Sequence, residues 1–60
     1  MEANREGAEE CLARALAALG KAPTDPTAAA SALRFLQRAQ RLYSSLPGLA
    51  EAFEGLPGNF

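Results

Sequence analysis

Three arginines are the residues of this 60-residue chain whose type and spacing are best suited to binding chemistry. Arg34, Arg38 and Arg41 follow an i, i+4, i+7 pattern, which places them in one stripe along a helix. Such a stripe could grip an acidic peptide or phosphate groups. The alternative is a solvated face that complements the negative end of the helix dipole. No lysine flanks the arginines, and this favours the solvated face.

Residues suited to catalysis or metal binding are few. Histidine is absent, and Cys11 is the only cysteine. Because Glu9 and Glu10 precede Cys11, and acidic neighbours disfavour the thiolate, a small core residue is its better interpretation. The remaining acid–base candidates are carboxylates on exposed helical turns, and a chain this short has little room to enclose them. We therefore expect no enzyme, and no catalytic residue, metal site or cofactor.

Composition and charge narrow the class of partner. Hydrophobic residues make up 48% of the chain and charged residues 22%, a balance typical of a folded domain. The formal net charge of −1 argues against nucleic acid as a partner. Since no apolar run approaches about 20 residues, we expect no direct membrane insertion. The lone cysteine and the acidic Glu2 near the start favour a cytoplasmic location.

The first half of the chain predicts one helix at about residues 4–20. Asn4 is the expected N-cap and Gly20 the expected stop, with acidic residues in the early turns, where the helix dipole favours them. Apolar residues at helical spacing define its expected buried face: Ala8, Leu12, Ala15, Leu16 and Leu19. Residues 20–26, with two prolines, then form a loop.

A second helix is predicted at about residues 26–45. Asp25 is the expected N-cap, and Pro26 occupies the first helical position, where its missing N–H is not needed. The strongest periodicity of the chain lies here, in Ala28, Ala32, Phe35, Ala39, Leu42 and Leu46, widened by Leu36 and Tyr43. We expect Phe35 to be the central core residue of this helix. Pro47 should end the helix near Ser44 or Ser45.

A short third helix is predicted at about residues 47–55. Ser45 or Leu46 is its expected cap, and Pro47 stands at its start. Its expected buried side is formed by Leu49, Ala52, Phe53 and Leu56, and its end is marked by Gly55, Pro57 and Gly58.

The short loop after the first helix predicts the fold. A connection of about seven residues forces the two long helices to pack antiparallel. Phe35 should then face Leu12 and Leu16, and the acidic Glu6, Glu9 and Glu10 should lie beside Arg38 and Arg41. The sequence thus predicts a single all-α domain over residues 1–60. It is an antiparallel helical hairpin with a short third helix, a small three-helix bundle. The small-residue spacing and the terminal Leu42-Tyr43 resemble those of helical hairpins in tetratricopeptide (TPR) and MIT domains.

Alanine-rich surfaces suggest a function. The faces that carry Ala13, Ala17 and residues 28–30 should leave shallow grooves where another helix can approach closely. The expected function is a non-catalytic protein–protein interaction module that docks a protein or an amphipathic peptide. Its candidate partner-binding residues are Arg34, Arg38, Arg41, Ala13 and Ala17. The alternative is a self-association element that forms a homodimer.

Two segments, residues 1–11 (MEANREGAEEC) and residues 32–43 (ALRFLQRAQRLY), carry a resemblance to a known family. They resemble the N-terminal region of membrane-anchored J-domain co-chaperones, the DnaJ subfamily B members 12 and 14, and the resemblance covers about two-thirds of the chain. Here Ser44 follows Tyr43 where that family usually has proline, and the loop is longer.

This resemblance implies an accessory domain of a chaperone-type protein. In those relatives, the parent protein lies on the cytosolic face of the endoplasmic reticulum. A chain without histidine cannot contain the His-Pro-Asp motif of a J domain. Stimulation of a heat-shock chaperone's ATPase is therefore not implied for these residues.

Overall fold

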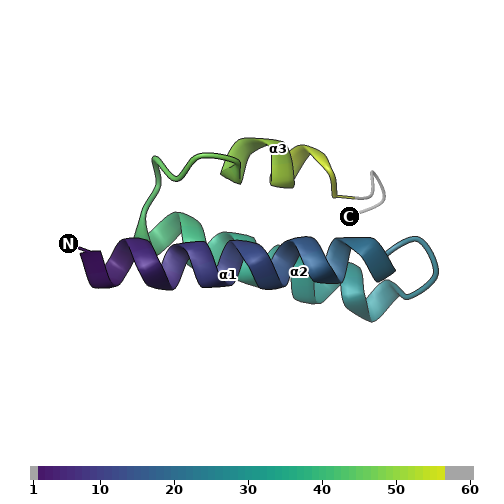
Figure 1. The fold of residues 1–60 in the computed structure, drawn as a ribbon. Coiled ribbons are helices and arrows are strands. Elements are labelled where there is room, and N and C mark those ends of the chain that lie inside the picture. Colours follow the sequence, from purple (N-terminus) through teal and green to yellow (C-terminus); the bar gives the residue numbers. More distant parts are fainter. Residues whose placement is uncertain (1, 57–60) are drawn as a thin grey trace.

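The computed structural model of the chain describes residues 2–56, with side chains from Asn4 onward. It is all-α: helix α1 spans Glu2–Lys21, α2 spans Pro26–Leu42 and α3 spans Leu49–Glu54. Figure 1 shows α1 and α2 lying side by side as a hairpin, with the short α3 along it. The predicted small three-helix bundle is confirmed. The expected ends at Pro57 and Gly58 lie outside the described residues.

Helix α1 is longer than predicted at both ends. Asn4 lies inside the helix rather than at its N-cap, because the helix already begins at Glu2. Gly20 also lies inside the helix, which continues to Lys21. It does not act as a stop because its φ is not positive, so it lacks the left-handed conformation of a C-terminal glycine cap. The chain turns instead over residues 22–24, with Asp25 N–H donating to the Lys21 carbonyl at 3.0 Å.

Gly20 gives a prediction about stability. A Cβ atom added there meets nothing within 4 Å, so alanine fits without strain. We expect Gly20→Ala to stabilise the fold by about 0.5–1 kcal/mol, since glycine loses more backbone freedom in a helix. Thermal unfolding followed by circular dichroism measures the gain. Gly48→Ala is the contrasting variant: Gly48 has φ 87°, so there the same change should lower the melting temperature. If Gly20→Ala and Gly48→Ala changed the melting temperature equally, the different backbone conformations of the two glycines would be contradicted.

The start of α2 is as predicted. Asp25 is the N-cap in an extended conformation, and Pro26 follows at the first position of the helix. The Asp25 Oδ1 atom accepts hydrogen bonds from the Thr27 hydroxyl and from the Thr27 N–H at 3.0 Å. These bonds favour the ionised carboxylate, so they hold the pKa of Asp25 below its ordinary value. The cap fixes where the hairpin loop ends.

The lowered pKa of Asp25 makes the cap sensitive to pH. A carboxylate whose pKa is lower in the folded state stabilises the fold above its unfolded pKa, and the effect is lost as the pH falls through the folded pKa. At neutral pH we expect the parent to melt at a higher temperature than Asp25→Ala, and this difference should shrink in acid. Asp25→Asn is the control, because asparagine caps without titrating. A parent advantage that stayed constant in acid would contradict the cap.

The connection between α2 and α3 differs from the prediction. Helix α2 ends at Leu42 rather than near Ser44 or Ser45, because Tyr43 already takes an extended conformation with φ −159° and ψ 90°. Gly48 is the N-cap of α3, which begins at Leu49. Neither Ser45 nor Leu46 caps α3, and Pro47 precedes it. The positive φ of Gly48 turns the chain into α3, a conformation that other residues rarely adopt.

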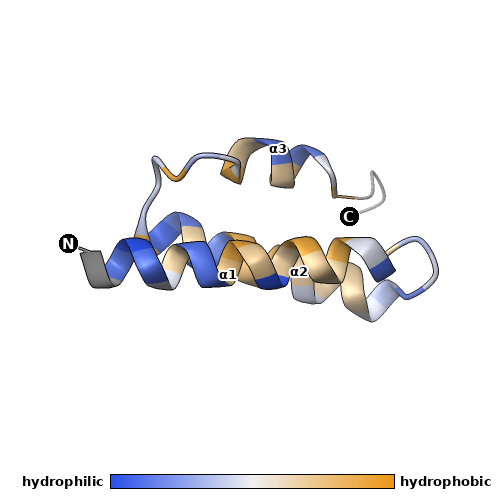
Figure 2. Ribbon diagram, viewed as in Figure 1, coloured by the Kyte–Doolittle hydropathy of each residue, from blue (hydrophilic) through white to orange (hydrophobic). Residues whose placement is uncertain are grey.

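Small residues form most of the contact between α1 and α2. They are buried along both helices, at Ala8, Ala15, Ala28, Ala29, Ala32 and Ala39. At one end of the hairpin, a Cβ atom on Gly7 would lie 3.3 Å from Leu42 Cδ1. Figure 2 shows that the hydrophobic residues of α1 gather in its second half, whereas its start is hydrophilic. Because the buried alanine side chains are small, the backbones of α1 and α2 can approach closely.

The large residue at the centre of the core is Leu36, which is 0% exposed. The expectation that Phe35 is central is wrong: Phe35 is partly buried at the edge of the core. It lines hollows with Cys11 and Arg14, not with Leu12 or Leu16. The cause is the rotation of α2, since consecutive residues on a helix point about 100° apart. Two other predicted core residues are exposed, Leu16 by 52% and Tyr43 by 36%.

Helix α3 covers one flank of the hairpin and runs parallel to α1. At its start, a Cβ atom on Gly48 would lie 3.6 Å from Leu12 Cδ2. At its end, one on Gly55 would lie 3.7 Å from Leu19 Cδ1. Leu49 and Ala52 are buried, and Phe53 packs against the core. Because α3 has only six residues, it covers a limited part of the hairpin.

Glu10 lies beside Arg38, as predicted, because both line one hollow, but the ion pairs of the described acidic residues form within α1. Glu9 pairs with Arg5 at 3.5 Å, and Glu10 pairs with Arg14 at 3.1 Å. Both pairs are exposed, and their i, i+4 spacing makes the two side chains neighbours on the helix surface. Pairs of this kind contribute little to the free energy of folding. The antiparallel pairing therefore depends on apolar packing.

Candidate functional site

Among the described residues, the most exposed large apolar side chain is that of Leu16, at 52%. It lies where α1 passes the α2–α3 connection, in a groove that we call the Leu16 groove. The groove is lined by Glu9, Leu12, Ala13, Leu16, Leu46 and Pro47. Leu46 is buried at 5% exposure and Leu12 is partly buried, so these two form the floor. Ala13 and Leu16 form the outer edge along α1.

The backbone conformation of the α2–α3 connection shapes this groove. Tyr43 leaves α2 in an extended conformation, and Gly48 turns the chain back toward α1. Between them, the Leu46 N–H donates to the Tyr43 carbonyl at 3.2 Å, which holds Leu46 in a turn. Glu9 is the one charged residue of the lining, and its carboxylate is paired with Arg5 at 3.5 Å. The groove is thus a largely apolar hollow of about 320 Å³.

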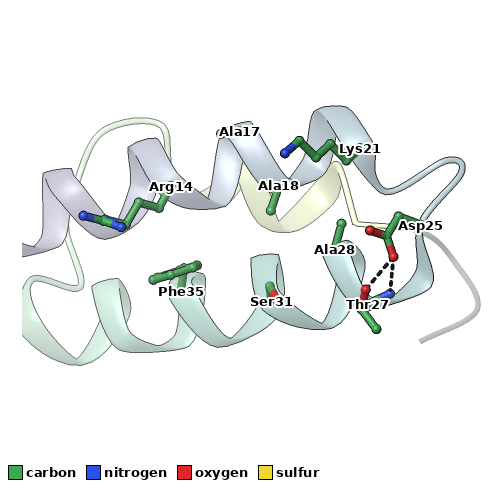
Figure 3. Close-up of a pocket in the computed structure, with 9 residues that line it drawn as sticks. All are labelled: Arg14, Ala17, Ala18, Lys21, Asp25, Thr27, Ala28, Ser31 and Phe35. Atoms are coloured by element: carbon green, nitrogen blue, oxygen red, sulfur yellow. Dashed lines mark hydrogen bonds between the residues drawn. The ribbon is translucent and has the colours of Figure 1, made fainter.

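The other flank of the hairpin carries a second surface, which we call the Phe35 face. Its apolar and small residues come from both long helices: Cys11, Ala18, Ala28, Ser31, Phe35 and Leu42. Figure 3 shows Ala18 of α1 and Ala28, Ser31 and Phe35 of α2 along the space between the two helices. Charged residues surround them, at Glu10, Arg14, Lys21, Asp25 and Arg38.

The predicted partner-binding residues do not form one site. Arg34, Arg38 and Arg41 are all exposed on α2, and Arg38 borders the Phe35 face. Ala13 lines the Leu16 groove, whereas Ala17 borders the Phe35 face. The arginines point away from the buried alanines of α2, as expected of a solvated face.

Leu16, Leu46 and Pro47 were missed as site residues. Leu16 has the spacing of a core residue, but α3 packs over Leu12 and Leu19 and leaves Leu16 at the edge of the covered face. Of residues 28–30, where an alanine-lined groove was expected, Ala28 lines the hollow of the Phe35 face together with Ala17, whereas Ala29 is buried. Only Ala30 of that segment is exposed. A sequence signal for the groove existed in Pro47-Gly48, a turn signal beside Leu46.

Three further properties of the described residues bear on function: metal binding, membrane crossing and the position of the cysteine. Over residues 2–56, no group of three or more cysteine and acidic residues is arranged to hold a metal ion. Within the same range, none of the helices has the length and hydropathy to cross a membrane. Cys11 is partly buried beside Phe35 and packs against the core, in line with its interpretation as a small core residue.

No family model, curated protein or solved structure matches this chain. The likeness to TPR and MIT domains therefore stays a prediction, as does the resemblance to J-domain co-chaperones.

Proposed function

We propose that this chain is a non-catalytic protein-interaction module that docks a partner through the Leu16 groove. The observation that carries the proposal is the exposure of Leu16 beside the buried Leu46 and the partly buried Leu12. A single exposed leucine is ordinary on a protein surface, but a leucine at the rim of an apolar groove is typical of a docking site.

The partner best suited to this groove is an amphipathic helix. The lining is apolar except for Glu9, whose charge is already balanced by Arg5. Such a surface recognises apolar side chains rather than charges. Ala13 at the edge leaves room for a helix to approach α1 closely, and leucine-type residues at i, i+3, i+4 and i+7 would lie along the groove.

The resemblance to J-domain co-chaperones supplies a hypothesis about context. In that hypothesis the module is an accessory domain in the cytoplasm, or on the cytosolic face of the endoplasmic reticulum, that places a client or chaperone. The docking role stands without this context, because it depends only on the groove.

Shift mapping tests the docking role. The probe is a synthetic amphipathic helix with leucines at i, i+3, i+4 and i+7, added to isotopically labelled protein. We expect the largest amide shifts at the Leu16 groove, around Ala13, Leu16 and Leu46. Leu16→Glu should abolish these shifts without unfolding the domain, because the side chain is already half exposed.

Ala30→Glu is the matched control, since it adds the same charge at an exposed position on α2. It should leave the shifts unchanged. Shifts centred on Arg34, Arg38 and Arg41 would instead assign binding to the arginine stripe. A probe that moves no resonance in the groove would refute the proposal.

A further inference from the structure

We propose that two copies of this chain pair through the Phe35 face. This inference goes beyond the docking role, because the Phe35 face lies on the flank of the hairpin away from the Leu16 groove. Its charged residues point to a second copy as the occupant, because a two-fold rotation brings acidic residues at the face opposite basic residues of the second copy.

The charges are arranged by the hairpin itself. Glu10 and Arg38 border the same hollow at one end of the face, where Gly7 of α1 meets Leu42 of α2. Lys21 and Asp25 border the hollow at the other end. Arg14 lines both hollows and is paired with Glu10 of its own chain. Apart from Arg14, each end carries one acidic and one basic residue, with the acidic one on α1 at the first end and in the loop before α2 at the second.

A two-fold axis in the plane of the face, perpendicular to the helices, makes these charges complementary. It places α1 antiparallel to the partner's α1 and α2 antiparallel to the partner's α2. Glu10 then approaches the partner's Lys21, and Arg38 approaches the partner's Asp25. The interface is isologous, so each pair occurs twice and the contact closes into a dimer. Complementary charges of this kind favour a partner that carries the opposite charges.

The shape of the face agrees with this arrangement. Ala18 and Ser31 lie near the middle, where their small side chains let two hairpins approach closely. Phe35 lies off the middle, toward Arg38, and it is only partly buried. The rotation places Phe35 over the partner's Ala28 and Ser31, within a hollow of about 390 Å³. A large aromatic side chain therefore meets a surface of small residues in each half of the dimer.

The remaining polar groups are compatible with the dimer. Arg14 is held by Glu10 of its own chain at 3.1 Å, so Glu10 can bridge Arg14 and the partner's Lys21. The two Thr27 bonds to Asp25 both use Oδ1, which leaves Oδ2 to accept from the partner's Arg38. The pairing therefore keeps the helix cap of α2.

Sedimentation equilibrium from micromolar to millimolar concentration tests the dimer. The parent should show a monomer–dimer equilibrium. Ser31→Glu should raise the dissociation constant at least about tenfold, because it brings two like charges together near the axis. Ala30→Glu, the neighbouring exposed position on the outer side of α2, should dissociate as the parent does. A parent that stays monomeric at every concentration, or equal dissociation of the two variants, would overturn the proposal.

A charge exchange tests the orientation. Glu10→Lys alone and Lys21→Glu alone should each weaken the dimer, and the double variant should restore it, because the two groups then attract again with exchanged signs. A circular dichroism spectrum checks that each variant is folded. A double variant no tighter than the singles would overturn the antiparallel pairing of α1. Leu16→Glu should leave the dimer intact, so failure of the dimer and failure of the docking role are separate results.

Discussion

Replacing Leu36 by alanine should unfold this domain at room temperature. In the described part of the chain, Leu36 is the one large side chain that is fully buried, and it packs with alanines of both long helices. Truncating a buried leucine typically costs about 2–5 kcal/mol. The hydrophobic core of a domain this small seldom supplies more than about 3–5 kcal/mol, so the loss removes most of its stability.

The helical circular dichroism signal measures this outcome. Leu16→Ala is the matched control, since it makes the same truncation at a leucine that is half exposed on α1. It should retain the helical signal and a cooperative melt. A Leu36→Ala variant that melts with the parent would show that Leu36 is not the central core residue. Thermal unfolding of Phe35→Ala, measured in the same way, compares the central Leu36 with its partly buried neighbour Phe35.

Enlarging Ala32 to leucine should destabilise the domain almost as strongly. Ala32 is 0% exposed and lies where α2 packs against α1. A larger side chain forces the two helices apart or into strained rotamers, at a typical cost of about 1–3 kcal/mol. The expected result is a marked fall in melting temperature, and thermal unfolding at one protein concentration measures it.

Ala30→Leu provides the control for Ala32→Leu. Ala30 is exposed two residues away in the same helix, and leucine is also a good helix former. Its melting temperature should stay close to that of the parent. If both variants melted alike, the close approach of α1 and α2 through alanine would be refuted.

Local signals in the sequence predicted the fold well. Asp25-Pro26 fixed the start of α2, because an N-cap and a proline at the first helical position act within a few residues. The short connection fixed the antiparallel hairpin. Gly20 was misjudged as a stop because a glycine ends a helix only when it takes the left-handed conformation, and the neighbouring turn did not require it.

The rotation of the helices could not be predicted in the same way. Phe35 and Leu36 are neighbours on a broad apolar stripe, and either could have been central by spacing alone. Which one is buried depends on how α1 and α3 pack against α2. The position of Leu16 had the same cause: its spacing on α1 fits a core face, but α3 packs over Leu12 and Leu19 and leaves Leu16 at the edge. The docking groove therefore arises from tertiary packing.

The docking role is tested most directly by the affinity of the amphipathic-helix probe for three proteins. Fluorescence anisotropy of the labelled probe gives its dissociation constant for the parent, Leu16→Glu and Ala30→Glu. We predict that Leu16→Glu weakens binding at least about tenfold, because it puts a charge against the apolar side chains of the probe, whereas Ala30→Glu binds like the parent. Equal affinity of the parent and Leu16→Glu would contradict the proposal that the Leu16 groove is the docking surface.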